Sequence, residues 1–293
     1  MPDDQPLPDA GPLTQRQFWD SRHGATAGGG DRGTRGRRGW PRSWFDMWRV
    51  RVGAEPGQAY AAYLFQKLMQ KALPTAPHWS VLEIGCAPGG NLVQFHRLFG
   101  YEPFGVEYSA VGVAQAQTLF QQHGLDPAHV IEADFADASF QECYRQRFDV
   151  ILSRGFIEHF EAPRKVVELH VNLLREGGYL VCSIPNLKSF SYPFLALLGR
   201  DVLRSHNTKI MSLRSFAALF GGLGLEPVYC GYCGMLQFFG KSMRYDRCLR
   251  GLVAGGLDRL EGVIDHLMFL GLRGTALETR WSSHLVFVGR RGG

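Results

Sequence analysis

Residues 81–95, VLEIGCAPGGNLVQF, are the most informative segment of this chain for its architecture. An apolar run ends in a turn that holds Gly85, Gly89, Gly90 and Pro88, and apolar residues then return at helical spacing. A strand that ends in a glycine-rich turn and opens a helix favours a bound ligand beyond the carboxyl end of the strand, because glycine lets the backbone approach it closely. A carboxylate, Glu83, stands two residues before the first glycine.

The same alternation of apolar strand and amphipathic helix continues along the chain and predicts an α/β fold with a mostly parallel, doubly wound sheet. The helix before the fifth strand is expected to end at Gly177-Gly178, since glycine commonly terminates helices. An irregular stretch before the last strand leaves room for a reversed strand. The strand candidates are 80–85, 102–107, 129–132, 148–153, 179–184, 227–232 and 284–289.

Composition indicates a folded protein with a sizeable core: of 293 residues, 45% are hydrophobic and 12% aromatic. Six irregularly spaced cysteines do not suggest a disulfide framework. Cys230 and Cys233 form a C-x-x-C pair without a second pair to complete a zinc site, so we expect buried strand cysteines there and at Cys86 and Cys182. No secretory signal or membrane-length apolar run is apparent, and we expect a soluble, cytoplasmic protein.

Residues 1–52 form a separate arm rich in glycine and arginine. Nine arginines and three aspartates lie between Arg16 and Arg51, which accounts for the net charge of +5. This basic arm either binds phosphate, an acidic lipid surface or an acidic partner, or is a solvated tail. Because Trp40, Trp44 and Trp48 are unusual in a tail, we expect the arm to fold over the ligand site of the main domain, residues 53–293.

Two classes of ligand compete for the glycine turn. A dinucleotide prefers G-x-G-x-x-G, but here Ala87 replaces the middle glycine and Pro88 lacks an N–H that could bind phosphate. A zwitterionic ligand without phosphates requires an acid near its cation and a donor near its carboxylate. Glu83 stands at the correct end of the strand for the first of these roles.

Two further acids end the next two strands. Glu107 lies where a carboxylate accepts both hydroxyls of an adenosine ribose, and Asp134 lies where it would take the adenine amino group, with Phe135 against the ring. Three acids in register at successive strand ends favour a nucleoside ligand over three solvated strand ends.

Taken together, Glu83-x-Gly85-x-x-x-Gly89, Glu107, Ala133-Asp134-Phe135, FDVILSRGFIEHF (148–160) and NLLREGGYLVCSIPN (172–186) resemble the class I S-adenosylmethionine-dependent methyltransferases. The resemblance implies a Rossmann-like seven-stranded sheet in the order 3-2-1-4-5-7-6 with strand 7 antiparallel. It also implies that the turn binds the methionyl part of S-adenosylmethionine. The cofactor-binding residues would be Glu83, Gly85, Cys86, Ala87, Gly89, Glu107, Tyr108, Asp134, Phe135 and Ser153.

The acceptor is expected to face residues 153–160, after the fourth strand. This segment lacks the Asn/Asp-Pro-Pro-aromatic motif of enzymes that methylate exocyclic base amines. It is similar to the Glu-x-x-Glu-His segment of ubiquinone-type O-methyltransferases, whose acids and histidine can hold a divalent metal. Glu158 and His159 match that pattern, but Gly155 replaces its first acid. We therefore expect no metal.

A neutral imidazole can take a hydroxyl proton near pH 7, which makes His159 the first candidate base. His206 is the second, within a 185–222 insert expected to form an acceptor lid, where SHNTKIMSLRSF (205–216) resembles the ubiquinone-type relatives. Alternatively, Glu158 and His159 only shape the wall of the site, and the insert is a lid core or dimer contact.

The sequence thus predicts methyl transfer to a small-molecule or lipid-like acceptor, most naturally at oxygen, and does not favour nucleic acid as the partner. A nicotinamide-dependent oxidoreductase and a non-catalytic methyltransferase-like module that binds nucleic acid or a partner through the arm are the alternatives. A nucleic-acid-binding arm would lose affinity steeply with salt.

Overall fold

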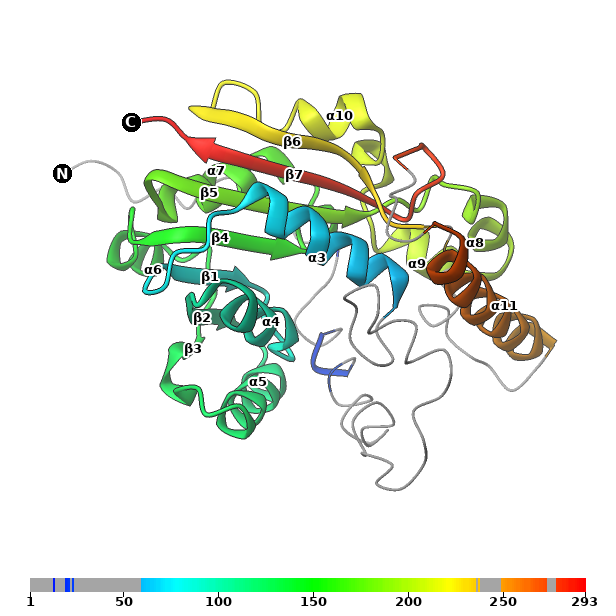
Figure 1. Cartoon of the computed structure of the whole chain (residues 1–293), viewed down its shortest axis with the longest axis horizontal. Coiled ribbons are helices and arrows are strands. Elements are labelled where there is room, and N and C mark those ends of the chain that lie inside the picture. The colour runs from blue at the N-terminus through cyan, green and yellow to red at the C-terminus, as the bar shows by residue number, and fades with distance from the viewer. Residues whose placement is uncertain are drawn as a thin grey trace.

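The computed structural model describes residues 13, 19–21, 23, 59–235, 237, 249–272 and 278–293. One seven-stranded sheet runs through the molecule in the order β3-β2-β1-β4-β5-β7-β6 (Figure 1). Strand β7 is antiparallel to both β5 and β6, whereas β3, β2, β1, β4 and β5 are mutually parallel. The predicted fold and strand order are confirmed.

All seven strands form at the predicted places, and several are longer than expected. Strand β5 begins directly after helix α7, which ends at Leu173 instead of Gly177-Gly178. The predicted end was wrong because Leu174 is fully buried and pairs with Phe148 at the start of β4. The strands are β1 Ser80–Ile84, β2 Glu102–Glu107, β3 Val130–Glu132, β4 Phe148–Arg154, β5 Leu174–Pro185, β6 Leu225–Cys233 and β7 His284–Arg291.

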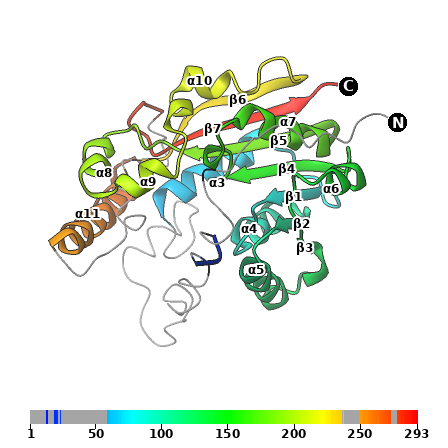
Figure 2. The same ribbon diagram turned by 180° about the vertical axis from the view of Figure 1, so that it is seen from behind.

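Helices cover both faces of the sheet, as the two opposite views show (Figures 1 and 2). Their bounds are α3 Tyr60–Ala72, α4 Gly90–Phe99, α5 Ala110–Gln122, α6 Ala138–Cys143, α7 Pro163–Leu173, α8 Tyr192–Leu198, α9 Arg200–Arg204, α10 Leu213–Ala217 and α11 Leu249–Leu272. Within the described residues, none of these helices has the length and apolar character needed to span a membrane.

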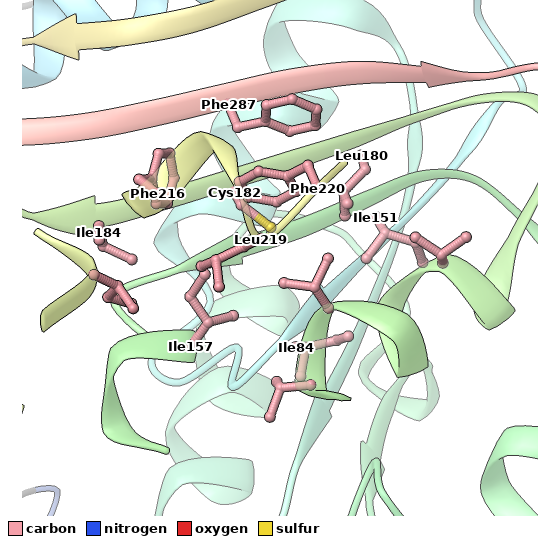
Figure 3. Packing of buried hydrophobic residues seen from close by; sticks show 14 of the residues in the cluster. Ile84, Ile151, Ile157, Leu180, Cys182, Ile184, Phe216, Leu219, Phe220 and Phe287 are labelled. Atoms are coloured by element: carbon pink, nitrogen blue, oxygen red, sulfur yellow. The ribbon is translucent and has the colours of Figure 1, made fainter. Parts of the chain in front are cut away.

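Alternate residues of the central strands feed two separate hydrophobic cores. Val81, Val150 and Val181 pack with helices α3, α4 and α5 on one face. On the other face, Ile151 and Leu180 pack with α6, α7 and α10. Figure 3 shows this second core, in which the Phe220 ring stacks on Phe287 at 3.8 Å and the Cys182 sulfur lies among apolar side chains. Such burial on both faces explains why the strands read as continuous apolar runs.

The segment expected to form the acceptor lid, residues 185–222, contains α8, α9 and α10, which continue from the carboxyl end of β5. Cys86, Cys182 and Cys233 are buried free cysteines, as expected, and Cys230 is half-buried. The boundary predicted at residues 52 and 53, and the predicted packing of Trp40, Trp44 and Trp48, lie outside the described residues.

Candidate active site

The glycine turn connects β1 to α4 and lies tightly against α5. Gly85 and Gly89 have φ of +69° and +96°, backbone conformations that other residues adopt only with strain. A Cβ on Gly89 would lie 3.4 Å from Phe120 and 3.5 Å from Ala116, both in α5. Glycine is therefore required at position 89 by the backbone conformation and by the close approach of α5. The absence of a side chain at this position is not by itself evidence that a ligand lies there.

The three acids of the predicted nucleoside site lie at the ends of β1 and β2 and just beyond the end of β3. Glu107 is 5% exposed, and its Oε1 accepts a hydrogen bond from the backbone N–H of Ser109 at 2.9 Å. Asp134 is exposed and accepts from the N–H of Ala136 at 2.9 Å. Both acids thus have fixed orientations at the edge where a donor nucleoside would lie, and their predicted contacts with ribose and adenine stay predictions.

Glu83 is the most buried of the three acids, at 2% exposure. Its Oε1 accepts from Asn91 Nδ2 at 2.6 Å, whereas its Oε2 is buried without a hydrogen-bond partner in the described structure. Burial raises the pKa of Glu83 to about 8, although Asn91 and the charge of Arg154 both act to lower it. An unsatisfied buried carboxylate oxygen of this kind is a natural acceptor for a ligand cation.

The other predicted cofactor residues surround the turn with different degrees of exposure. Cys86 and Ser153 are buried, whereas Ala87 and Tyr108 are half-buried. Phe135 is only 6% exposed, and its ring meets those of Phe156 and His170 edge-on at 5.2 Å and 5.4 Å. The aromatic ring predicted to face adenine is therefore already packed in the core, and its contact with a nucleoside stays a prediction.

The two candidate bases, 47 positions apart, lie side by side. A short 3₁₀ turn, Ile157–His159, follows β4 and carries Glu158 and His159. The residues after α9 bring His206 to this turn, with 4.4 Å between the ring centroids of the two histidines. Glu158 Oε1 lies 4.0 Å from His159 Nε2. The structure thus joins both predicted histidines and one acid in a single cluster.

Backbone carbonyls fix the orientation of both imidazole rings. His159 Nδ1 donates to the carbonyl oxygen of Ser205 at 2.7 Å, and His206 Nδ1 donates to that of Val202 at 2.6 Å. A proton held on Nδ1 places the lone pair of a neutral ring on Nε2. In His159 that atom faces Glu158, and both rings are therefore oriented as bases or as metal ligands.

Glu158 is completely buried, and neither of its carboxylate oxygens has a hydrogen-bond partner among the described residues. Burial raises the pKa of this carboxyl group to about 8. The sequence pattern indicates only a possible metal ligand or a wall residue at Glu158, because it does not reveal the burial of the side chain. In the structure its side chain lies against His159.

The resemblance to ubiquinone-type enzymes implies a divalent ion, and the donors present can be compared with that requirement. Single ligand atoms of Glu158, His159 and His206 all lie within 4.8 Å of one another. One carboxylate and two imidazoles form a suitable ligand set for a transition metal. The expectation of no metal rested on the absence of an acid at Gly155 and did not consider His206 as a third ligand. It stays a prediction.

The described part of the N-terminal arm contacts both halves of the site. Leu13 N donates to the carbonyl oxygen of His159 at 2.7 Å, and the Trp19 ring meets the His159 ring edge-on at 5.0 Å. Asp20 accepts from Ser109 Oγ at 2.5 Å, next to Glu107. Figure 1 shows this short blue segment near the carboxyl ends of the parallel strands. Leu13 and Trp19 thus contact His159, and Asp20 contacts Ser109 beside Glu107, whereas the folding of the whole arm over the site stays a prediction.

Arg154 and Asn91 were missed by the sequence analysis. Arg154 ends β4, and its Nη1 donates to Asn91 Oδ1 at 2.6 Å, which joins it through Asn91 to Glu83. An arginine at the end of a mostly apolar central strand was the available signal. Its partners come from other elements, so the signal alone could not specify a role.

Comparison with known proteins agrees with this geometry. A family of methyltransferase domains matches residues 58–229. The ubiquinone biosynthesis O-methyltransferase of Ruegeria pomeroyi is 29% identical over 157 residues, which cover 50% of this chain and 60% of that protein. The chain therefore spans less than two thirds of the length of this relative.

Two further similarities concern different acceptors. The mRNA cap guanine-N(7) methyltransferase of Schizosaccharomyces pombe is 32% identical over 132 residues, which cover 41% of this chain and 36% of that protein. The structure of geranyl diphosphate C-methyltransferase from Streptomyces coelicolor, in complex with Mg²⁺, geranyl diphosphate and S-adenosyl-L-homocysteine, superimposes with a TM-score of 0.52. It is 18% identical and covers 88% of this chain and 89% of that chain.

The family match over more than half of the chain, the strand order and the glycine turn with its acids agree on one family and one cofactor. The chain belongs to the class I S-adenosylmethionine-dependent methyltransferases and is an enzyme of that family.

Proposed function

We propose that this enzyme transfers the methyl group of S-adenosylmethionine to an oxygen atom of a small-molecule or lipid-like acceptor, with His159 as the general base. The observation that carries the proposal is the buried cluster of Glu158, His159 and His206 at the end of β4. The similarity to ubiquinone biosynthesis O-methyltransferases supports oxygen as the acceptor atom.

Methyl transfer is an in-line displacement at the methyl carbon. A bond forms between the acceptor oxygen and this carbon while the carbon–sulfur bond breaks, and the sulfur keeps that electron pair and becomes neutral. The hydroxyl proton of the acceptor passes to His159. Most of the acceleration comes from alignment of the two reactants, and removal of the proton contributes a further factor of roughly 10²–10⁴.

Glu158 supports the base electrostatically. An ionised carboxylate whose oxygen lies 4.0 Å from His159 Nε2 stabilises the imidazolium that forms, because charges attract strongly in a site that excludes water. The pKa of Glu158, raised to about 8 by burial, makes this support increase with pH through the range near 8. The His206 ring packs against the His159 ring and limits its motion.

A divalent ion is the competing way to activate the acceptor, and Glu158, His159 and His206 would hold it. Such an ion would act as a Lewis acid and lower the pKa of the acceptor hydroxyl. We favour the imidazole base because Gly155 leaves a single carboxylate in the cluster, and Mg²⁺ strongly prefers oxygen ligands.

The test uses S-adenosylmethionine with a ¹³C-labelled methyl group and separate panels of phenols, alcohols, amines and carboxylic acids. We expect label on phenolic or alcoholic oxygen, identified by the ¹³C shift of the product. Label only on amines would overturn the proposal. If activity disappears with chelator and returns with one added metal, activation of the acceptor by a metal ion would replace general-base catalysis by His159 as the mechanism.

A further inference from the structure

Arg154 lies at the carboxyl end of a central strand, and the described residues place no anion directly against its guanidinium. Its Nε is buried without a hydrogen-bond partner in this part of the chain, and its Nη1 donates to the neutral amide of Asn91 at 2.6 Å. The guanidinium carbon lies 3.9 Å from the centroid of the Phe65 ring. Among the described residues, no carboxylate lies within ion-pair distance of Arg154, because Glu83 is reached only through Asn91.

Among the described residues, the charge of Glu83 favours the charged form of Arg154, but Asn91 stands between the two side chains. Burial lowers the pKa of Arg154 and raises that of Glu83 to about 8, so burial disfavours the charged form of both groups. Burial and the charge of Arg154 lower the pKa of His284, on β7, to about 3, and this histidine is therefore neutral. Arg154 is half-buried, and a partly desolvated cation without a directly paired anion is costly, so a bound anion would stabilise it.

We propose that Arg154 binds the α-carboxylate of S-adenosylmethionine, and that Asn91 holds the guanidinium in place for this contact. The donor carries an ammonium and a carboxylate on the same carbon, and the site offers matching groups. In the proposed complex the unsatisfied Oε2 of Glu83 would accept from the ammonium, and the Arg154 guanidinium, one amide away, would donate to the carboxylate. Arginine is well suited to a carboxylate because its planar fork donates two parallel hydrogen bonds.

The position in the fold supports this assignment. In open α/β sheets the ligand lies across the carboxyl ends of the strands, and Arg154 and Glu83 occupy the ends of neighbouring strands β4 and β1. Asn91 is the second residue of α4, directly after the glycine turn. All three side chains therefore belong to the methionyl end of the donor site, so the inference rests on the cofactor and is independent of the proposed acceptor.

The test is a thermodynamic cycle measured by isothermal titration calorimetry. The ligands are S-adenosylhomocysteine and its analogue S-adenosyl-3-thiopropylamine, which lacks only the carboxylate. The proteins are the parent enzyme, Arg154→Met, which keeps the apolar stem, and Arg147→Met, which removes an exposed arginine just before the opposite end of β4. The cycle isolates the carboxylate contact from other effects of the substitution.

We expect the parent enzyme to bind the full ligand roughly 10- to 100-fold more tightly than the analogue, as for a charge-assisted hydrogen bond. Arg154→Met should bind both ligands with nearly equal affinity, and Arg147→Met should behave like the parent. Retained binding of the analogue shows that Arg154→Met is folded. If that variant does not fold, the comparison of the two ligands on the parent enzyme and on Arg154→Lys, which should bind the full ligand with intermediate affinity, still tests the proposal.

Three results would overturn the proposal. Equal loss of affinity for both ligands would make Arg154 a packing residue, and an unchanged preference for the full ligand in Arg154→Met would place the carboxylate elsewhere. An increase confined to the acceptor's KM would show that Arg154 binds an anionic group of the acceptor.

Discussion

Replacing Glu107 with glutamine should weaken the binding of S-adenosylhomocysteine by about 1.5–3 kcal/mol, or roughly 10- to 100-fold, the usual loss for hydrogen bonds to a charged group. The predicted role of Glu107 is to accept hydrogen bonds from both ribose hydroxyls. Glutamine keeps the shape of the side chain, and its carbonyl oxygen can still accept from Ser109 N. Alanine would also remove this contact, which lies at the start of α5.

The measurement is calorimetric titration of S-adenosylhomocysteine into the parent and Glu107→Gln enzymes. Glu102→Gln is a matched control, because Glu102 is exposed at the opposite end of the same strand, β2. We expect the control to match the parent within about 0.5 kcal/mol, as for most surface substitutions. Unchanged affinity in a folded Glu107→Gln protein would refute the assignment of Glu107 to the ribose.

His159→Ala should lower kcat roughly 10²–10⁴-fold without weakening the binding of S-adenosylhomocysteine. The kcat of the parent enzyme should rise with pH through the range in which histidine titrates. A fully active variant would contradict the assignment of His159 as the general base. Burial raises the pKa of Glu158 to about 8 in the folded protein, whereas in an unfolded chain this carboxyl group releases its proton near its ordinary pKa of 4.5. The unfolded state therefore binds fewer protons between these values, and stability falls as pH rises. Glu158→Gln should flatten this dependence in thermal melts between pH 5 and 8, and identical slopes would contradict the raised pKa. Trp19→Ala should speed carbethoxylation of His159, which is 4% exposed, as read by peptide mass spectrometry; Trp281→Ala should not, and equal rates would show that the arm does not protect His159.

The sheet was predictable because its signals are local. Strand β2 was predicted with its observed bounds, and the ends of β1 and β4 to within one residue. The end of α7 was predicted wrongly, because the glycine pair at 177–178 suggested that the helix ends there. Gly178 instead lies inside β5, where a Cβ would approach the carbonyl oxygen of Asp149 to 2.8 Å. Tertiary packing therefore determined a boundary that the local signal placed four residues later.

The candidate site was predictable only where its residues are positioned by strand ends. Glu83 and Glu107 follow from the register of β1 and β2. The contact between Arg154 and Asn91 spans 63 positions and depends on where α4 lies relative to the end of β4. No local pattern contains that information, and the unsatisfied groups that suggest a carboxylate site become visible only in three dimensions.

The histidine pair shows how the segment after β5 and the core of the enzyme depend on one another. Asn207 N donates to the carbonyl oxygen of Glu158 at 2.6 Å, and Asn207 Nδ2 donates to that of Phe160 at 3.1 Å. Ser205 in turn accepts from His159 Nδ1. These bonds hold the turn that carries the proposed base from the side of the predicted lid. A change of sequence in residues 205–207 would therefore alter the position of His159 as well as the wall of the acceptor site, and selectivity and rate would change together.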